Sequence, residues 1–306
     1  MDISKKIQKI LGRGVRENVN LADYTTMKVG GAARYFYVAD DIKNFMKAII
    51  FIQDEKIPYI IIGGGSNIIV SDKGFDGLVI LNKASNISFI PEKAQVIVDS
   101  GVSLMRLIME SANRDLGGIE CLYGIPGTVG GAVYGNAGSN ETEIASFIKS
   151  ITLIDSNNKI IRVKPDWLMA DYRSTKLKNL KKSGKKSPII LTVTFQLSHH
   201  KKEEISRKIQ YFKVLREEKQ PYNKPSAGSI FKNVGREKEK RAGYILDQVG
   251  AKKLKVGGAE VSKKHANFIV NFKNATSGDI IELIEGMKKL AHDNYGVELE
   301  EEVELI

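Results

Sequence analysis

Cysteine and histidine are scarce in this sequence. Its 306 residues include one cysteine, Cys121, and four histidines, at positions 199, 200, 265 and 292. A single cysteine cannot form an internal disulfide, which fits a reducing cytoplasm. Structural zinc sites need four Cys or His ligands, so the composition also argues against one. We therefore predict a cytoplasmic protein without a bound metal.

Long apolar runs are missing as well. No segment approaches the roughly 20 apolar residues of a membrane-spanning helix. The first residues, MDISKKIQKILGRGVREN, carry Lys and Arg but no apolar core or small-residue cleavage site, so we expect no signal peptide. The sequence predicts no insertion into a membrane.

Acidic residues are outnumbered by basic ones, with a formal net charge of +11. A basic excess suits anionic partners such as nucleotides or nucleic acid. Lysine-rich segments such as 176–187 are, however, more often solvated surface. No helix-turn-helix, zinc-finger or RNP-like pattern accompanies the charge, so we predict no nucleic-acid partner.

The periodicity of apolar residues predicts a mixed α and β protein of about two domains, at roughly 150 residues each. Around residue 200 the sequence changes to charged, amphipathic helical segments, which places the domain boundary there. Asp40 or Asp41 and Ser277 are candidate N-caps, and Gly250 and Gly296 are candidate helix ends. Helices are expected over 41–56, 103–116, 203–221, 241–250 and 277–296, and strands over 57–62, 68–72, 77–81, 148–155, 160–164, 189–197 and 297–306.

A first glycine loop, GGGSN at 63–67, follows a predicted strand. A Rossmann phosphate loop needs G-x-G-x-x-G opening onto a helix, and here the next segment reads as strand. The P-loop pattern is absent too. Successive N–H groups in a glycine turn can still hold an anion in a backbone nest. The alternative is a plain sharp turn between strands.

A second glycine-dense stretch, YGIPGTVGGAVYGNAG, covers residues 123–138 and is almost free of charge. Neither a polar surface linker nor a core strand has this composition. An amphipathic core helix would not lack side chains in this way either. We interpret the two stretches as two walls that bring bare backbone against one large, flat, anionic cofactor.

Six short motifs follow one another along the chain. They are GGGSN (63–67), GIPGTVGGAVYGNAG (124–138), YRST (172–175), PSAGSIFKN (225–233), GGAEVSKKHANFIVN (257–271) and a terminal EEV (301–303). This ordered set resembles the UDP-N-acetylenolpyruvoylglucosamine reductase family from about Leu21 to the last residue. The short segment between Arg173 and Ser229 is similar to the compact second type of that family.

The resemblance implies an α+β fold. A p-cresol-methylhydroxylase-type FAD-binding domain with two subdomains would occupy 1–200, and a smaller α+β substrate-binding domain 201–306. It also implies that NADPH reduces FAD, and that the flavin N5 then transfers hydride to the enolpyruvyl group of a UDP-sugar. The product would be UDP-N-acetylmuramate, a precursor of peptidoglycan. One pocket would serve both ligands in turn, and we expect a monomer.

Three residues match the catalytic positions of the family. Arg173 would stabilise the enolate, Ser229 would donate the proton, and Glu302 would act together with Arg173. In isolation each has a simpler interpretation: a surface arginine, a turn serine and a solvated acid. Strand periodicity in VELEEEVELI predicts Val297, Leu299, Val303 and Leu305 on one face and Glu298, Glu300, Glu302 and Glu304 on the other.

The resemblance also implies binding residues. Substrate contacts are expected from Lys219, Lys232 and Asn233, with Arg216 as an alternative to Lys219 for the UDP diphosphate. His265 is either a ligand contact or a packed ring, and Thr25, Gly30 and Gly31 are weaker cofactor candidates. The predicted FAD-binding residues are Gly63, Gly64, Gly65, Ser66, Asn67, Pro126, Gly127, Thr128, Gly130, Gly131 and Ala132.

The sequence departs from the family pattern at three places: residues 139–140, Val234 and Glu304. Two other functions stay open. One is another FAD oxidoreductase of the same fold. A flavin attached covalently through His or Cys would support that function. The other is a basic, non-catalytic nucleotide-binding protein.

Overall fold

The computed structural model describes residues 3–139 and 141–306. The chain forms two compact units. The first comprises Met1–Glu17, Tyr35–Gly64 and Gly77–Val214, and the second Asn18–Arg34, Gly65–Asp76 and Leu215–Ile306. Three segments thus build each unit, whereas the sequence predicts one boundary near residue 200. The functional division into 1–200 and 201–306 stays a prediction.

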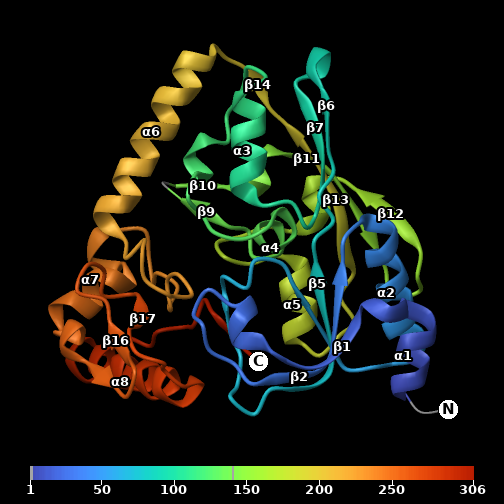
Figure 1. Ribbon diagram of the computed structural model, residues 1–306. Coiled ribbons are helices and arrows are strands. Elements are labelled where there is room, and N and C mark those ends of the chain that lie inside the picture. Colours follow the sequence, from blue (N-terminus) through green and yellow to red (C-terminus); the bar gives the residue numbers. More distant parts are fainter. Residues whose placement is uncertain (1–2, 140) are drawn as a thin grey trace. The chain divides into compact units, whose positions relative to one another are not determined.

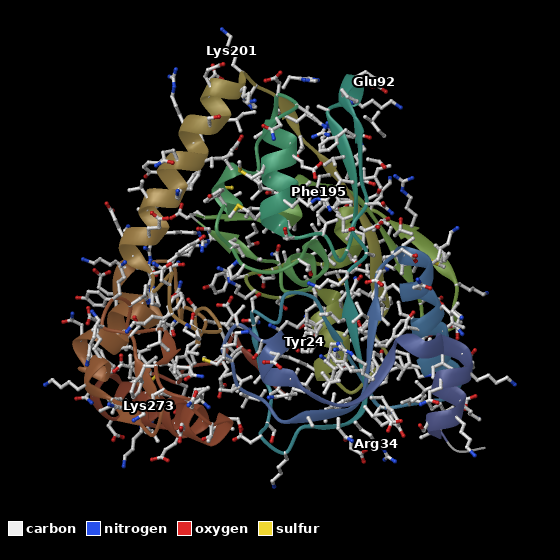
Figure 2. The ribbon with its side chains drawn as sticks, in the orientation of Figure 1. Tyr24, Arg34, Glu92, Phe195, Lys201 and Lys273 are labelled. Atoms are coloured by element: carbon white, nitrogen blue, oxygen red, sulfur yellow. The ribbon has the colours of Figure 1, made fainter. Side chains whose placement is uncertain are left out.

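The first unit contains a five-stranded antiparallel sheet (Figure 1) of order β12-β11-β13-β7-β6. The strands are β12 (Ile160–Val163), β11 (Ile148–Ile154), β13 (Ile189–Gln196), β7 (Gln95–Asp99) and β6 (Ile87–Ile90). Central β13 carries β-branched and aromatic residues, and its Phe195 is fully buried among the side chains seen in Figure 2. The strands predicted over 148–155, 160–164 and 189–197 are confirmed.

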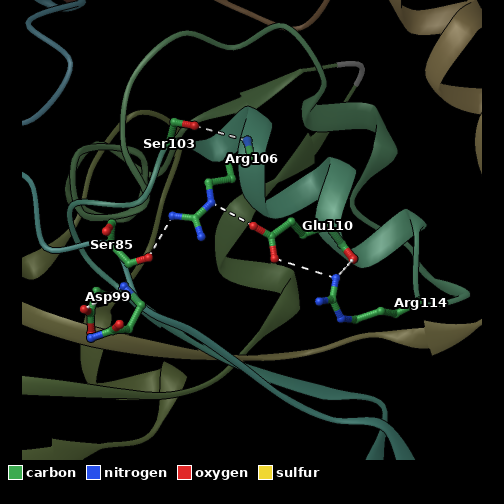
Figure 3. A network of polar contacts seen from close by, with 7 residues as sticks. Ser85, Asp99, Ser103, Arg106, Glu110 and Arg114 are labelled. Atoms are coloured by element: carbon green, nitrogen blue, oxygen red, sulfur yellow. Dashed lines mark hydrogen bonds and ion pairs between the residues drawn. The ribbon is translucent and has the colours of Figure 1, made fainter.

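Helix α3 (Leu104–Ala112) buries Leu104, Leu107 and Ile108 in the core beside this sheet. Ser103 caps it by accepting a hydrogen bond from the N–H of Arg106 at 3.1 Å. Its solvent side carries a row of charged contacts (Figure 3), in which Arg106 donates to Glu110 at 2.7 Å and to the Ser85 carbonyl at 2.8 Å. The predicted helix over 103–116 is confirmed, though it ends earlier.

Helices α1 (Ile3–Leu11) and α2 (Ile42–Asp54) contribute to a second core in the same unit, around Phe45 and Ile49. Asp41 caps α2 by accepting from the N–H of Asn44 at 2.7 Å, as the sequence predicts. Strand β3 (Tyr59–Ile62) runs parallel to β5 (Phe75–Asn82). These two strands belong to a sheet of order β1-β2-β5-β3, with β1 Val15–Asn20 and β2 Ala32–Ala39.

The core of the second unit lies between helices α7 (Ala242–Gln248) and α8 (Ser277–Tyr295) and a three-stranded antiparallel sheet. The sheet order is β15-β16-β17, with β15 Lys255–Val256, β16 Ala259–Val261 and β17 Ile269–Asn271 (Figure 1). Met27, Val29 and Ile69 from the N-terminal segments join this core. Both predicted helices are confirmed, as is α6 (Lys202–Lys219) for the helix over 203–221.

The predicted cap of α8 is wrong by one residue. Thr276 is the N-cap and forms a reciprocal capping box with Asp279. Ser277 instead turns its hydroxyl and N–H toward Asp72, at 2.8 and 2.9 Å. At the other ends of the helices, Gly250 and Gly296 have the left-handed φ values of 75° and 62° that favour glycine there.

The C-terminal segment is much less regular than the strand predicted over 297–306. Only β18 (Glu304–Leu305) is a strand, paired in parallel with β4 (Ile68–Ile69). Glu301 pairs with Phe231 instead, so the segment changes partner on its way to the end. Leu299 and Val303 are buried as predicted, but Leu305 is 50% exposed, which contradicts the simple alternation. No helix in the described part of the chain is long and apolar enough to span a membrane.

Candidate active site

The two glycine stretches contact each other within the first unit. A Cβ on Gly63 would lie 2.2 Å from Thr128 Oγ1, and one on Gly64 would lie 2.7 Å from the Cα of Gly127. Gly127 itself has φ 118°, a conformation that side chains disfavour. At this point Gly63 leaves room for the Thr128 side chain and Gly64 for the Gly127 backbone, so close contact between the two stretches accounts for these two glycines.

The second stretch also contains a helix that the sequence does not predict, α4 (Val129–Tyr134), capped by Thr128. Val129 and Gly130 donate to the carbonyls of Val102 and Ser100, both at 2.8 Å, and Gly131 donates to Thr128 Oγ1. The first N–H groups of α4 therefore already have protein partners. Ala132 turns into the core, whereas Gly131 is exposed, with no atom closer than 3.7 Å to a Cβ placed there.

The first loop keeps polar groups for a ligand. Across residues 3–139 and 141–306, the hydrogen bonds include none donated by the N–H groups of Gly63 or Gly64. Gly64 is exposed, and its neighbour Gly127 brings no side chain. Exposed N–H groups in a glycine turn suit an anionic group such as the pyrophosphate of FAD. The residues present fit the predicted cofactor at this position.

The other predicted FAD residues differ in their surroundings. Pro126 is exposed, next to Gly127 in the first unit. Gly65, Ser66 and Asn67 belong to the second unit, where Gly65 has φ 60° and a Cβ on it would meet the Tyr24 carbonyl at 2.0 Å. Asn67 donates from Nδ2 to the Glu302 carbonyl at 3.0 Å. Its side chain therefore holds the C-terminal segment.

The weaker cofactor candidates have structural surroundings in the second unit. Thr25 is 2% exposed and donates from Oγ1 to the Val29 carbonyl at 3.0 Å. A Cβ on Gly31 would come within 2.1 Å of the Asp72 carbonyl, and one on Gly30 within 2.8 Å of Val70. Close packing accounts for these residues.

Arg173 lies at the corner of a tight turn in the first unit. Asp171 and Ser174 exchange two backbone hydrogen bonds of 3.0 Å, which leaves Tyr172 and Arg173 at the turn, the latter at φ 51°. The guanidinium donates from Nη2 to the Gly138 carbonyl at 2.8 Å and lies over the Tyr172 ring. The turn presents a half-buried, permanently charged group.

Ser229 and Glu302 lie on paired backbone segments of the second unit. Glu302 donates its N–H to the Ile230 carbonyl at 2.8 Å, and Lys232 donates to the Glu300 carbonyl at 2.9 Å. Ser229 also forms a bridge with Phe268. The structure thus brings two of the three predicted catalytic residues into one part of a unit, and both are half-buried.

The neighbours of Glu302 have ion-pair partners of their own. Glu300 pairs with Lys232 at 2.8 Å, and Glu301 contacts Lys288 of α8. The hydrogen bond that Lys288 donates to Glu301 raises the pKa of Lys288 above its usual value. Both neighbours of Glu302 are therefore tied to lysines of the second unit.

The predicted substrate residues are dispersed. Lys232 is held by its ion pair with Glu300, and Asn233 accepts from the N–H of Ala242 at the start of α7, at 3.1 Å. Lys219 is exposed at the end of α6, and Arg216 donates to Gln220 at 3.1 Å. Nothing in these contacts opposes or requires substrate binding, so their roles stay predictions.

The ring of His265 packs against protein neighbours. It stacks edge-on against Phe268 at 4.9 Å and accepts the N–H of Asn267 on Nδ1 at 3.2 Å. Burial, and then the positive charge of Lys252, lower its pKa. The thiol of Cys121 has a raised pKa, chiefly through burial, which does not favour a reactive thiolate. Within the described ranges no cluster of His, Cys, Asp and Glu could hold a metal.

Two buried asparagines at these sites are missed by sequence reasoning. Asn267 is 2% exposed and holds Phe231 by two hydrogen bonds, one to its N–H at 3.0 Å and one to its carbonyl at 2.8 Å. Asn136 is fully buried and contacts the turn that carries Arg173. A left-handed φ of 45° at Asn136 is a signal, but only the structure reveals it. Asn140 lies outside the described residues.

Comparisons with known proteins agree with this geometry. Residues 220–306 match the C-terminal domain of UDP-N-acetylenolpyruvoylglucosamine reductase, and residues 33–164 match an FAD-binding domain. The chain is 39% identical to the reductase of Chlamydia muridarum, over 95% of this chain and 94% of the relative. The chain belongs to the UDP-N-acetylenolpyruvoylglucosamine reductase family. The Clostridium novyi reductase is 37% identical over 100% of this chain and 97% of its own length.

A solved structure of the reductase family supports the fold. The crystal structure of the reductase from Thermus caldophilus matches with a TM-score of 0.79 and 32% identity, over 95% of this chain and 99% of that one. The predicted fold class is therefore confirmed: an FAD-binding domain of the p-cresol-methylhydroxylase type, followed by the reductase family's own C-terminal domain, in a mixed α and β protein. The predicted compact second type is tested by none of these matches and stays a prediction.

Proposed function

We propose that Arg173, Ser229 and Glu302 are the catalytic residues of the reaction of this family. That reaction is the reduction of UDP-N-acetylenolpyruvoylglucosamine to UDP-N-acetylmuramate in peptidoglycan synthesis, and FAD and NADPH are its cofactors. The observation that carries the residue assignment is the pairing of the Ser229 segment with the Glu302 segment, through the hydrogen bond between Glu302 and Ile230.

Each residue has a chemical task that suits its type. When bound, FAD supplies hydride transfer, with NADPH as the reductant. Arg173 grips the substrate carboxylate in two-point fashion and stabilises the negative charge that develops on it. The Ser229 hydroxyl gives a proton to the carbon next to the carboxylate. Glu302 acts with Arg173 to stabilise the enolate.

Serine is a weak acid, so Ser229 needs a basic acceptor and a fixed position. The enolate is such an acceptor. The fixed position is supported by the bridge to Phe268 and by Asn267, which accepts on its carbonyl from the N–H of Ile230 at 2.9 Å. These contacts fix the main chain that carries the Ser229 hydroxyl.

The glycine turn is the proposed seat of the FAD pyrophosphate. Gly63 and Gly64 have N–H groups to donate, and Gly127 and Thr128 form the adjoining backbone. The UDP diphosphate would use cations of the second unit, Lys219 or Lys232. Lys232 must exchange its partner Glu300 for the ligand in order to do so. Asn233 is a further proposed substrate contact, and a monomer in the cytoplasm is the proposed state of the protein.

One spectroscopic experiment tests this function. The purified protein is scanned anaerobically in the visible range, then after NADPH, and then after the enolpyruvyl UDP-sugar. Bleaching of the flavin bands by NADPH and their recovery on adding the sugar are the expected results. A bleached flavin that only oxygen restores would assign another substrate. A folded protein that neither carries nor takes up flavin would overturn the assignment of the glycine turn.

A further inference from the structure

Asn136 belongs to the second glycine-dense stretch and contacts the turn that carries Arg173. Its side chain is fully buried, in a position where an unpaired amide would be costly. Nδ2 donates to Glu143 Oε2 at 2.6 Å and to the Asp171 carbonyl at 2.8 Å. Oδ1 accepts the N–H of Ala145 at 3.3 Å. Both amide protons and the oxygen are in use.

The contact with the Asp171 carbonyl reaches the backbone that carries Arg173. Asp171 opens the tight turn, and its carbonyl also accepts the N–H of Ser174 at 3.0 Å. Asn136 therefore donates to a carbonyl that closes the turn. Because Arg173 has φ 51°, the turn is held in a sparsely populated conformation and needs support from its surroundings.

The contact with Glu143 reaches the hairpin to which the Arg173 guanidinium is hydrogen-bonded. Strands β9 (Gly138–Ser139) and β10 (Thr142–Glu143) pair antiparallel, with Glu143 opposite Gly138. Arg173 Nη2 donates to the carbonyl of this same Gly138 at 2.8 Å. By holding the side chain of Glu143, Asn136 fixes the hairpin on which the guanidinium rests. The backbone and the charged end of Arg173 are thus secured by one amide.

We propose that Asn136 is a positioning residue that sets the Arg173 guanidinium for the substrate carboxylate, through the Asp171 carbonyl and through Glu143. The inference rests on the proposed role of Arg173. An amide is required because the position must donate to a carbonyl and a carboxylate from one nitrogen while its oxygen accepts from an amide N–H. An aspartate has nearly the same shape but no donor for either partner.

Paired substitutions can separate the two contacts. Asn136→Asp alone places a carboxylate beside Glu143, and the like charges destabilise the fold. In N136D/E143Q the amide of the new glutamine donates to the new aspartate, so that contact is restored with its direction reversed. The Asp171 carbonyl then faces an oxygen and stays without its donor. Glu143→Gln is the matched control, since its side-chain oxygen still accepts from Asn136.

The readouts are the two half-reactions, the thermal midpoint and the affinity for product. We expect N136D/E143Q to regain the midpoint of Glu143→Gln and to be reduced by NADPH at the same rate. Its reoxidation by the enolpyruvyl UDP-sugar should be slower by roughly tenfold or more, because misplacing a charged group by a fraction of an ångström has effects of this size. The affinity for UDP-N-acetylmuramate, measured by the shift of the flavin bands on binding, should fall by the same factor as the rate of reoxidation.

The proposal is overturned if N136D/E143Q is reoxidised at the rate of Glu143→Gln. It is also overturned if the rates of both half-reactions fall equally and in step with the thermal midpoint. If the double variant does not fold, Asn136→Ala is assayed below its midpoint for the same ratio of reoxidation to reduction. Arg173→Ala serves as the reference. Undiminished reoxidation in that variant would remove the proposed role of Arg173 itself, which is a different failure from that of Asn136.

Discussion

The two units hold their proposed catalytic residues by different means. In the first unit, Arg173 sits in a two-residue turn that is closed by two backbone hydrogen bonds and also receives a hydrogen bond from one buried side chain, Asn136. In the second, Ser229 and Glu302 lie on segments joined mainly by backbone hydrogen bonds, such as that from Glu302 to Ile230. Backbone bonds do not depend on which side chains the segments carry. The turn, in contrast, has one particular buried amide among its hydrogen-bond donors.

We expect this difference to decide how well each segment tolerates substitution. The C-terminal segment carries Glu304 where the family motif leads us to expect arginine, and the pairing of Glu304 with Ile68 is still made by the backbone. Around Arg173, a change of one atom in Asn136 removes donors that nothing else replaces. Four predictions sharpen this comparison, from the largest expected effect to the smallest.

Arg173→Ala should slow flavin reoxidation by the enolpyruvyl UDP-sugar by about 10²–10³-fold, since a single electrostatic contact to a developing oxyanion has this effect. Glu302→Ala should act on the same step, with its backbone bond to Ile230 kept. Reduction by NADPH should change by less than about twofold in both variants, measured by anaerobic stopped flow.

Arg162→Ala is the matched control, because it removes a guanidinium that contacts Ser150 in the sheet of the first unit. It should leave both half-reactions unchanged. Equal losses in reduction and reoxidation for Arg173→Ala or Glu302→Ala would mean that their assigned roles are wrong.

Asn267→Ala should lower the free energy of unfolding by about 2–4 kcal/mol, because it leaves the buried N–H and carbonyl of Phe231 without partners. Urea unfolding is the measurement, with exposed Asn223→Ala as the control in the same unit. A loss no larger than that of the control would show that the backbone pairing alone holds the segment, which would make the contrast between the two units sharper still.

Gly64→Ala should destabilise the protein by about 1–3 kcal/mol, because the new methyl group would overlap the backbone of Gly127. In Gly131→Ala the new methyl group would meet no atom closer than 3.7 Å, and in a helix it should raise stability by up to about 1 kcal/mol. Both are measured by chemical denaturation of the flavin-free protein. Should the two variants behave alike, contact between the glycine stretches would not be the reason for Gly64.

His265 should make a small contribution that depends on pH. Burial lowers the pKa of its ring in the folded protein below the ordinary value of 6.5, so the unfolded chain takes up the proton first. Its stabilising contribution is therefore complete above pH 6.5 and is lost as the pH falls toward the lower folded pKa. The slope is at most about 1.4 kcal/mol per pH unit. His265→Gln should flatten the curve of unfolding free energy between pH 7 and 5, whereas an unchanged curve would contradict this origin.

Much of the secondary structure was predictable because it depends on local pattern. Helices α2, α3, α6 and α8 were predicted from apolar periodicity with caps or stop signals, and strands β11, β12 and β13 from β-branched runs. Strands β6 and β7 of the same sheet were not predicted. Helix α4 was not predicted, since its glycines weaken the apolar period. The strand predicted over 297–306 is too long, because the alternation of apolar and acidic residues does not reveal the change of partner between Glu301 and Glu304.

The candidate site was predictable only in part. The motifs point to Arg173, Ser229 and Glu302 through resemblance, and periodicity alone does not separate Glu302 from Glu300. The asparagines that support these residues, Asn136 and Asn267, have partners 35 and 36 residues away in the sequence. No local pattern encodes a hydrogen bond over such a separation. Buried polar contacts of this kind appear only once the chain is folded.

The parallel pairing of β4 with β18 also has a consequence for synthesis of the chain. Ser71 donates to the carbonyl of Ile306 at 2.7 Å, so the segment that supplies Ile69 to the second core gains this partner only after residue 306 is translated. At roughly 5–20 residues per second, the intervening stretch takes on the order of ten to fifty seconds. During that time apolar side chains such as Ile69 lack their partners on the nascent chain.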